Sequence, residues 1–323
     1  MITIDNCPIV ICTYKNRESL TLGNLDKLKP YNIFLFIRRD DFYESEYDKY
    51  DFPDNVNIEL IDNVTNINNT REKAVSIMQS KGYDYMFMID DDIYLDHAYK
   101  ISSKGLRPSG KTHRLEKIPI VELFNKIIDT ANEYNASFCS PQIEYNVGFN
   151  KPGQVFVNTR LTFGTFVWLN IKDMKEYNIH YDDETKHVAE DMDIVLQMMW
   201  KGLTCITVGD YAFKWKFDKR QKHVGSTVGD EEHYKRYKMG IYNKWKDYIN
   251  VCVRRGKVIF KPRYKEIVGK YPEEYIIDTP FYRNLKDISK TFDTKAFHEY
   301  LLNVPRVEPP KRRYGPRKKK KIE

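Results

Sequence analysis

Three consecutive carboxylates, Asp90–Asp92, directly follow the apolar run Tyr85–Ile89 (YMFMI). Such a run is typical of a buried central strand, and ligands of open α/β sheets bind beyond the carboxyl ends of the strands. In an extended chain Asp90 and Asp92 point to the same side, and two carboxylates suit Mg²⁺ or Mn²⁺ bound to a phosphate. The alternative is a solvated acidic turn, but three adjacent negative charges repel each other unless a cation offsets them.

A second acidic group opens the segment Val188–Lys201 (VAEDMDIVLQMMWK), which reads as a helix that ends at Gly202. Glu190, Asp191 and Asp193 fall in its first turn, where negative charge stabilises the helix dipole. The same carboxylates could take a proton from a bound hydroxyl group. The residues alone leave both interpretations open.

The elements that position these residues alternate between strand and helix in the first 90 residues. This alternation predicts parallel strand pairing with right-handed crossovers, and therefore an α/β fold. The expected strands are Pro8–Tyr14, Asn32–Ile37, Asn57–Ile61 and Tyr85–Ile89, and the expected helices are Leu20–Leu28 and Asn68–Ser80. Arg39–Asp54, acidic and aromatic, is expected to be a surface excursion.

The pattern changes after Ile101. Ser102–Lys117 is basic and contains Gly and Pro, which predicts a long functional loop beside the acidic site. Gly164 interrupts an apolar segment, which predicts a strand or bend that a ligand approaches closely. The remaining expected elements are a helix at Ile118–Tyr134 and strands at Ala136–Ser140, Leu161–Asn170 and Leu203–Val208.

Composition favours a soluble protein with reduced thiols. The chain has 323 residues, of which 31% are charged, and none of its apolar runs reaches the ~18 residues of a membrane span. Five cysteines without C-x-x-C spacing read as core thiols. No basic, apolar leader opens the sequence. We therefore expect a cytoplasmic protein, located in the host cytoplasm if a phage encodes it.

The positive charge is concentrated at one end. Residues 311–321 (KRRYGPRKKKK) hold eight basic residues, and removing these from the 53 Lys and Arg leaves 45 against 46 Asp and Glu. An uneven charge of this kind indicates an anionic polymer as partner. A solubilising disordered end is the alternative.

Four short pieces in order resemble the GT-A glycosyltransferases. They are ICTYKNRESL, NNTREKA before GYDYMFMIDDD, TFGTFVWLN, and AEDMDIVLQMMWKG followed by KHVGST, and together they span roughly Ile9–Thr227. The resemblance implies a Rossmann-like, mostly parallel central sheet flanked by helices. The expected glycosyltransferase domain covers 1–230. The sequence pattern beyond it predicts a C-terminal helical extension at 231–303, and the Pro- and Lys-rich composition predicts a disordered basic tail at 304–323.

The resemblance also assigns roles to the site residues. It implies a nucleotide-sugar donor, a UDP-sugar above all, and a divalent ion, Mn²⁺ or Mg²⁺, on its diphosphate. Asp191 would be the catalytic base in an inverting member of the family, and Glu190 beside it would face the acceptor. The implied nucleotide contacts are Thr13, Tyr14, Arg17, Arg71, Asp90 and Asp91, and the implied metal ligands are Asp90, Asp92 and His223.

Several of these assignments have simpler alternatives. Arg71 could pair with a helix carboxylate, and His223 could be an ordinary surface histidine. Thr13 and Tyr14 could be plain turn residues.

The acceptor is a separate question. Size, layout and the Lys-, Asn-, Ile- and Tyr-rich composition look similar to phage enzymes of the TET-associated type, which glycosylate hydroxymethylated pyrimidines in DNA. A DNA base would have to be flipped to reach the sugar, and rings such as those of Tyr211–Trp215 could stack on it or simply fill the core. Two alternatives remain: a GT-A enzyme that acts on cell-surface polysaccharide, and a non-catalytic nucleic-acid-binding protein.

Overall fold

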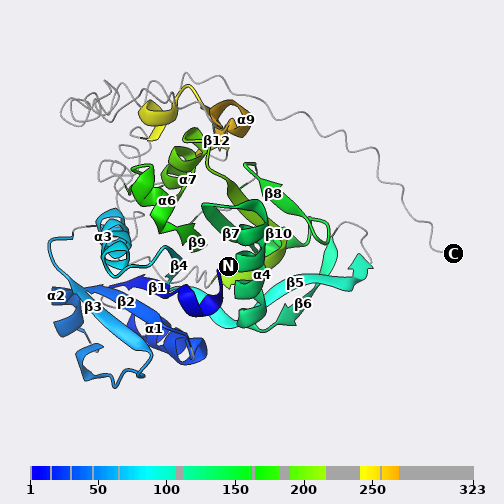
Figure 1. Ribbon diagram of the computed structural model, residues 1–323. Coiled ribbons are helices and arrows are strands. Elements are labelled where there is room, and N and C mark those ends of the chain that lie inside the picture. Colours follow the sequence, from blue (N-terminus) through cyan, green and yellow to red (C-terminus); the bar gives the residue numbers. More distant parts are fainter. Residues whose placement is uncertain are drawn as a thin grey trace, which may run out of the picture.

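The structure is a computed structural model that describes residues 2–14, 17–29, 31–45, 47–64, 66–106, 112–159, 161, 164–181, 190–215, 241–254 and 257–268. Within these residues the chain forms a mixed α/β fold around one large sheet, which confirms the predicted class (Figure 1). His223, the basic tail and most of the predicted extension lie outside the described residues.

The central sheet has ten strands, and nine of them follow the order β3-β2-β1-β4-β9-β7-β10-β5-β6, while β8 pairs with β10. Strands β3, β2, β1 and β4 are parallel to one another, as the strand–helix alternation predicts, and β7 is parallel to β10. The other pairs are antiparallel. The strands are β1 (Ile9–Thr13), β2 (Ile33–Arg38), β3 (Val56–Ile61), β4 (Tyr85–Asp90), β5 (Ile93–Leu106), β6 (His113–Ile118), β7 (Phe138–Ile143), β8 (Val155–Val157), β9 (Phe166–Asn170) and β10 (Cys205–Trp215).

Helices cover both faces of this sheet. One face packs against α3, α6 and α7, and the other against α1 and α4. Alternate residues of β4 separate the two cores: Met86 and Met88 face α3 and α7, whereas Phe87 and Ile89 face α4. The helices are α1 (Glu18–Leu25), α2 (Arg39–Tyr43), α3 (Ile67–Ser80), α4 (Ile120–Tyr134), α5 (Glu144–Val147), α6 (Ile171–Glu176), α7 (Glu190–Trp200) and α9 (Tyr264–Ile267).

Two expectations about surface segments are wrong. Ser102–Lys117 is not a long loop, because β5 continues to Leu106 and β6 begins at His113, and the two strands pair antiparallel. Arg39–Asp54 is not a simple surface excursion either. It contains α2 and a 3-10 turn at Tyr47–Lys49, and the side chain of Tyr47 is completely buried.

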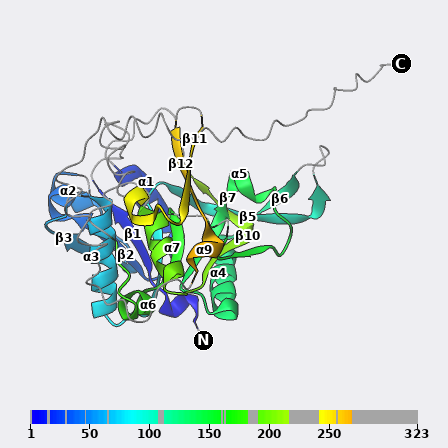
Figure 2. The ribbon, with the colours of Figure 1, turned by 90° about the horizontal axis from the view of Figure 1, so that it is seen from above.

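The described part of the C-terminal extension is not purely helical. Residues 241–245 are helical, but β11 (Ile249–Arg254) and β12 (Lys257–Pro262) form a separate two-stranded antiparallel sheet. This sheet and α9 lie beside α7 (Figure 2). Ile241, Trp245, Ile249 and Ile267 belong to the same core as α7, so these residues are packed against the main sheet domain.

No helix among the described residues is long and apolar enough to cross a bilayer. The four cysteines whose side chains the structure describes, Cys7, Cys12, Cys139 and Cys205, are buried free thiols. Burial raises the pKa of Cys7 and of Cys12 to about 12, so these thiols remain protonated at neutral pH. They act as apolar packing groups, as their sequence spacing predicts.

Candidate active site

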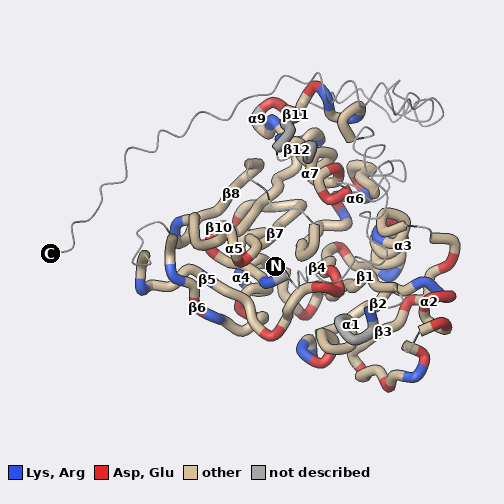
Figure 3. The backbone as a smooth tube through the Cα atoms, turned by 180° about the vertical axis from the view of Figure 1, so that it is seen from behind, with Lys and Arg blue, Asp and Glu red and all other residues tan. Residues whose placement is uncertain are grey.

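The predicted site residues meet where β1 and β4 end, next to the beginning of α7. Parallel pairing places Cys12 of β1 beside Asp90 of β4, so the segments that follow these two strands emerge side by side. Arg71 of α3 and Glu190 of α7 complete the group from the face of the sheet that these helices cover. The acidic ends of β4 and α7 are visible in Figure 3.

Asp91 points toward α1 and contacts polar side chains of β1 and of the segment that leads into that helix. Thr13 donates from Oγ1 to Asp91 Oδ2 at 2.8 Å, and Arg17 donates from Nη1 to Asp91 Oδ1 at 3.3 Å. The same Arg17 nitrogen lies 3.6 Å from Asp92 Oδ2. Its Nε donates to the hydroxyl of Tyr14 at 2.9 Å. Four residues that the resemblance assigns to the nucleotide, Thr13, Tyr14, Arg17 and Asp91, therefore form one hydrogen-bonded group.

The hydroxyl groups of Thr21 and Tyr47 hold Thr13 in place. Thr13 Oγ1, Thr21 Oγ1 and the Tyr47 hydroxyl are each 2.9 Å from one another, and all three side chains are buried. Asn24 donates to the backbone carbonyls of Asp91 and Ile93 at 3.2 and 3.0 Å, which fixes the chain on both sides of Asp92. No sequence pattern indicates the role of Tyr47, because a tyrosine in an acidic stretch carries no signal that predicts burial.

Arg71 connects the end of β4 with the beginning of α7. Its Nη2 atom donates to Asp90 Oδ1 at 2.8 Å, and its Nη1 atom donates to Glu190 Oε1 at 2.9 Å. The arginine side chain is only 5% exposed. Burial alone lowers the pKa of this guanidinium, but the charges of Asp90 and Glu190 oppose burial, and the resulting pKa lies above its ordinary value. The geometry favours the ion-pair interpretation of Arg71, since both of its terminal nitrogens already contact carboxylates.

Asp191 lies one residue further along α7, beside Gly164. Its Oδ1 atom accepts from the backbone N–H of Met192 at 2.8 Å. A Cβ atom at Gly164 would lie only 2.6 Å from Asp191 Oδ2, and Gly164 has a φ of +96°. Only glycine adopts this conformation readily and leaves room for the carboxylate. Within the protein, the group that approaches Gly164 closely is Asp191, and the approach of a ligand at this glycine stays a prediction.

The electrostatics of the group are unbalanced. Five carboxyl groups (Asp90, Asp91, Asp92, Glu190 and Asp191) face two guanidinium groups (Arg17 and Arg71). Burial raises the pKa of Asp91 to about 7, although the Arg17 charge opposes this. Burial and then the neighbouring Glu190 charge raise the pKa of Asp191 to about 7 as well. The excess of negative charge suits a bound cation.

The predicted metal ligands are brought together only in part. Asp90 and Asp92 both lie at the end of β4, but Asp90 is bound to Arg71 and Asp92 lies near Arg17. The third predicted ligand, His223, lies outside the described residues. Within the described part of the chain, no group of three or more His, Cys, Asp or Glu residues is arranged to hold a metal ion. The two carboxylates and the charge excess fit a divalent cation, and a third protein ligand is not supplied by these residues.

The third acid of α7 has a different environment from the first two. Asp193 is buried and accepts from Lys244 Nζ at 2.8 Å, from Trp245 Nε1 at 2.7 Å and from Gln197 Nε2 at 2.8 Å. Both members of the Asp193–Lys244 ion pair are 1% exposed. Asp193 therefore joins α7 to residues 241–245, whereas Glu190 and Asp191 face the group around Asp90.

Comparison with known proteins gives one family match. The profile of the family described as TET-Associated Glycosyltransferase matches residues 7–225. No curated protein sequence matches the chain.

Three solved structures illustrate what the chain is similar to. S. aureus TarS 1–349 in complex with UDP is 12% identical with a TM-score of 0.42, and the match covers 73% of this chain and 64% of TarS. GalNAc-T7 with UDP, GalNAc and Mn²⁺ is 11% identical with a TM-score of 0.42, and the match covers 75% of this chain and 49% of that chain. The 4-diphosphocytidyl-2C-methyl-D-erythritol synthase of Anaerococcus prevotii is 13% identical with a TM-score of 0.31, covering 54% and 74%.

Proposed function

Because this chain belongs to the TET-associated glycosyltransferase family, we propose that it transfers a sugar from a UDP-sugar to the hydroxyl group of a hydroxymethylated pyrimidine in DNA. The observation that carries the proposal is the convergence of Asp90–Asp92 with Glu190 and Asp191. Carboxylates are needed on the donor side to hold a cation for the diphosphate, and on the acceptor side to take a proton from the hydroxyl group. The fold brings the two sets of carboxylates together from positions a hundred residues apart. Family membership establishes a glycosyltransferase, as the sequence resemblance implies.

The donor side of the proposed site is the group around Asp91. Tyr14 and Arg17 would offer a ring and a guanidinium to the nucleotide, and Thr13 holds Asp91, the proposed ribose contact, in place. The Arg17 guanidinium carbon lies 5.0 Å from the centre of the Tyr14 ring, so the two side chains support each other. UDP is bound in the TarS and GalNAc-T7 structures, which is why a UDP-sugar is the donor we propose.

Asp90 and Asp92 would hold the divalent ion, with His223 as the third protein ligand. The ion would supply positive charge to the diphosphate as it leaves. Arg71 does not need to contact the nucleotide for this chemistry. It holds Asp90 and Glu190 in place, and it partly compensates the negative charge before the donor binds.

Asp191 is the proposed base. One of its carboxylate oxygens would take the proton of the acceptor hydroxyl, whose oxygen forms the new bond to the sugar carbon as the bond to the diphosphate breaks. The pKa of Asp191, about 7, lies in the range where a carboxylate is both ionised and basic enough for this step. Glu190, which is bound to Arg71, keeps the beginning of α7 oriented toward the donor.

The experiment that tests this function is a screen of nucleotide-sugars. The protein would be incubated with Mn²⁺, each donor, and DNA that contains either 5-hydroxymethylcytosine or ordinary cytosine. The product nucleosides would then be identified by mass. We expect a nucleoside heavier by one sugar only from the hydroxymethylated DNA. Donor hydrolysis with no sugar added to the hydroxymethylated DNA would retain the glycosyltransferase but exclude the DNA acceptor. Transfer to polysaccharide would then replace it.

The basic tail gives a second test of the acceptor. Deletion of all residues after Pro310 removes eight positive charges from a chain that is otherwise nearly neutral. We expect weaker DNA binding with a flatter salt dependence, because each lost phosphate contact lowers the slope of log K against log salt by ~0.9 on duplex DNA. Unchanged binding of the shortened protein at physiological salt would reduce the tail to a solubilising segment.

A further inference from the structure

One face of β5, β6 and β10 carries cationic and aromatic side chains directly beyond the candidate active site. Strand pairing places Tyr94 opposite Lys214, and Tyr99 opposite Lys117. Directly paired residues point to the same side of a sheet. The register between β5 and β10 shifts between Ala212 and Lys214. Phe213, which lies between them, points into the core that α4 covers, so Ala212 and Lys214 share the other side. Tyr94, Tyr99, Lys117 and Lys214, together with His97, are called the β5–β10 face below.

The contacts within the β5–β10 face show that it is compact. Lys214 Nζ lies 5.2 Å from the centre of the Tyr94 ring. His97 Nε2 and the Tyr99 hydroxyl are 2.8 Å apart. Burial lowers the pKa of His97, and the charges of Lys117 and Lys214 lower it further, so both lysines act on the same point. Lys117 is exposed, and Lys214 and Tyr94 are half-buried.

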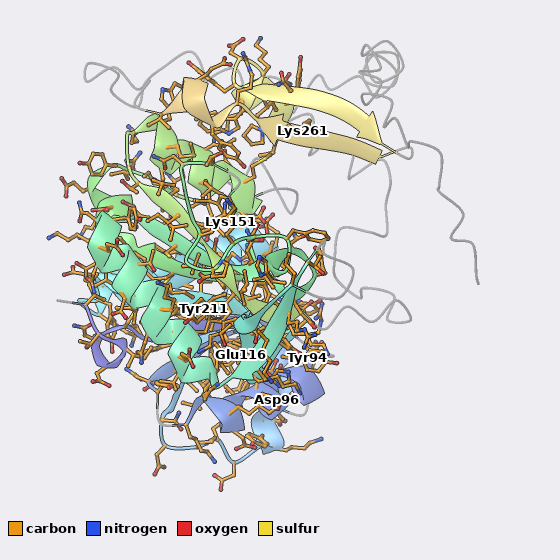
Figure 4. All side chains as sticks on the ribbon, turned by 90° about the vertical axis from the view of Figure 1, so that its right-hand side faces the viewer. Tyr94, Asp96, Glu116, Lys151, Tyr211 and Lys261 are labelled. Atoms are coloured by element: carbon orange, nitrogen blue, oxygen red, sulfur yellow. The ribbon has the colours of Figure 1, made fainter. Side chains whose placement is uncertain are left out.

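The β5–β10 face lies on the same side of the sheet as the candidate catalytic carboxylates. Ile93 and Ala98 point the other way, into the core that α4 covers, whereas Met88 faces the core of α7. Figure 4 shows Tyr94 on the far side of the sheet from Glu116 and Tyr211. Tyr94 is only two residues beyond Asp92, which corresponds to about 7 Å of extended chain. A molecule that reaches the carboxylates from this direction must pass over the face.

Two acidic groups near this face lie among the described residues, Asp96 and Glu144. Burial and then the Glu144 charge raise the pKa of Tyr99, and Asp96 and Glu144 partly oppose the lowering of the His97 pKa. Asp96 is also bound to Lys27. Helix α5 borders the face through Val147, which packs in a small core with Tyr99. Next to this helix the ring of Phe149 is 70% exposed. Lys and Arg residues along β5 and β6 are visible in Figure 3.

We propose that the β5–β10 face holds the DNA strand that flanks the acceptor base, with Lys117 and Lys214 on phosphate groups. This inference rests on the DNA acceptor proposed above. Lysine charges bind a nucleic-acid backbone without reading sequence, and rings such as those of Tyr94 and Phe149 offer surfaces for unstacked bases. A base that leaves the duplex needs its neighbouring phosphates fixed close to the reaction centre. The lysines of the β5–β10 face would fix these phosphates at the edge of the group of carboxylates.

The chain offers a matched control on the same strand. Arg114 is exposed and lies three residues before Lys117 in β6, on the opposite side of the sheet. Arg114 points to the same side of β6 as Glu116, which is two residues later. Glu116 and Glu122 of α4 both contact Lys100, so this is the side of the sheet that α4 covers. Lys117→Glu and Arg114→Glu therefore change the protein's net charge equally, and only the first alters the β5–β10 face.

The experiment measures binding of the full chain to a duplex that contains 5-hydroxymethylcytosine, over a range of salt concentrations. Lys117→Glu and Lys214→Glu should each weaken binding roughly tenfold at low salt and lower the salt slope by about one. Arg114→Glu should change binding less than twofold. Hydrolysis of the UDP-sugar without DNA should be equal in all four proteins, which shows that the fold and the donor site are intact.

Each result has a defined meaning. Equal losses in Lys117→Glu and Arg114→Glu would show a general charge effect and overturn the assignment of this face, while the DNA acceptor would stand. Normal binding by both lysine variants would overturn it as well. Donor hydrolysis by a wild-type protein that neither binds nor modifies DNA would refute the DNA acceptor itself, and the face with it.

Discussion

Replacement of Asp191 by Asn should abolish most of the activity and, at the same time, stabilise the protein. As the proposed base, Asp191 accepts a proton that asparagine cannot accept. General-base catalysis typically contributes 10²–10⁴-fold to a rate, so we expect turnover to fall at least ~100-fold. Donor binding should be retained, because the group around Asp91 is separate from Asp191.

The stabilisation follows from the cost of the Asp191 charge. A carboxyl group whose pKa moves from 3.8 to about 7 is penalised by at most about 4 kcal/mol when it ionises in the folded protein. The side chain is half-buried, so solvent removes part of that penalty. Loss of a negative charge at the beginning of α7 costs ~0.3–1 kcal/mol. The charge penalty is the larger effect, and we expect Asp191→Asn to raise the free energy of unfolding by about 1–2 kcal/mol.

The gain should depend on pH in a defined direction. The folded protein binds the Asp191 proton more tightly than the unfolded chain does, so wild-type stability falls as the pH rises from about 4 to about 7. The variant lacks this titration. Its advantage should be absent below pH 4, grow up to pH 7 and remain constant above. Wild-type turnover should rise over the same range as the base ionises.

Asp193→Asn is the matched control, because it makes the same change two residues away. Asp193 forms a buried ion pair with Lys244, so its loss leaves an uncompensated charge and should cost about 3–5 kcal/mol. Urea unfolding of both variants at pH 5 and pH 8, without donor or metal, measures the contrast. If the Asp191→Asn protein were less stable than the wild type at pH 8, the charge of the wild-type Asp191 carboxylate would be fully compensated. Normal turnover in that variant would refute its role as base.

Three further outcomes are expected. Gly164→Ala should lower both stability and turnover, because the added methyl group collides with the Asp191 carboxylate. Gly82 has a similar positive φ but open space around it, so Gly82→Ala should show only the backbone cost of about 1 kcal/mol. Equal effects of the two substitutions on turnover would disprove the collision. Asp92→Asn should remove metal-stimulated transfer with little change in unfolding, and full activity in excess chelator would contradict the metal assignment. Arg71→Gln should destabilise the protein by about 2–3 kcal/mol, since two carboxylates lose their partner, whereas unchanged stability would mean that solvent screens them.

The sequence was most informative where local pattern and function coincide. The apolar run before Asp90–Asp92 has the length and composition of a buried strand, and the structure places a strand at Tyr85–Asp90. The helix expected at Asn68–Ser80 is also present as α3, and its Ala74 and Met78 are buried. Both predictions rest on interactions that short segments determine by themselves, namely burial at a fixed period.

What the sequence did not reveal depends on contacts between distant segments. Tyr47 is buried because Thr13 and Thr21 offer hydroxyl partners, and no local pattern encodes that. Ser102–Lys117 has the basic, Gly- and Pro-containing composition of a loop, but β5 pairs with β10 on one side and with β6 on the other, and no local pattern encodes these pairings. The bridge from Arg71 to Glu190 joins residues 119 positions apart.

The buried pair of Asp193 and Lys244 also determines when, during synthesis of the chain, α7 can gain its buried ionic partner. Chains emerge from the ribosome in N- to C-terminal order. Every described candidate for catalysis, and the whole region that matches the family, has been translated by residue 225, yet the counter-charge of Asp193 follows nineteen positions later. A premature stop codon in that interval would therefore leave all these active-site residues in the product, but without the partner that holds α7 in place.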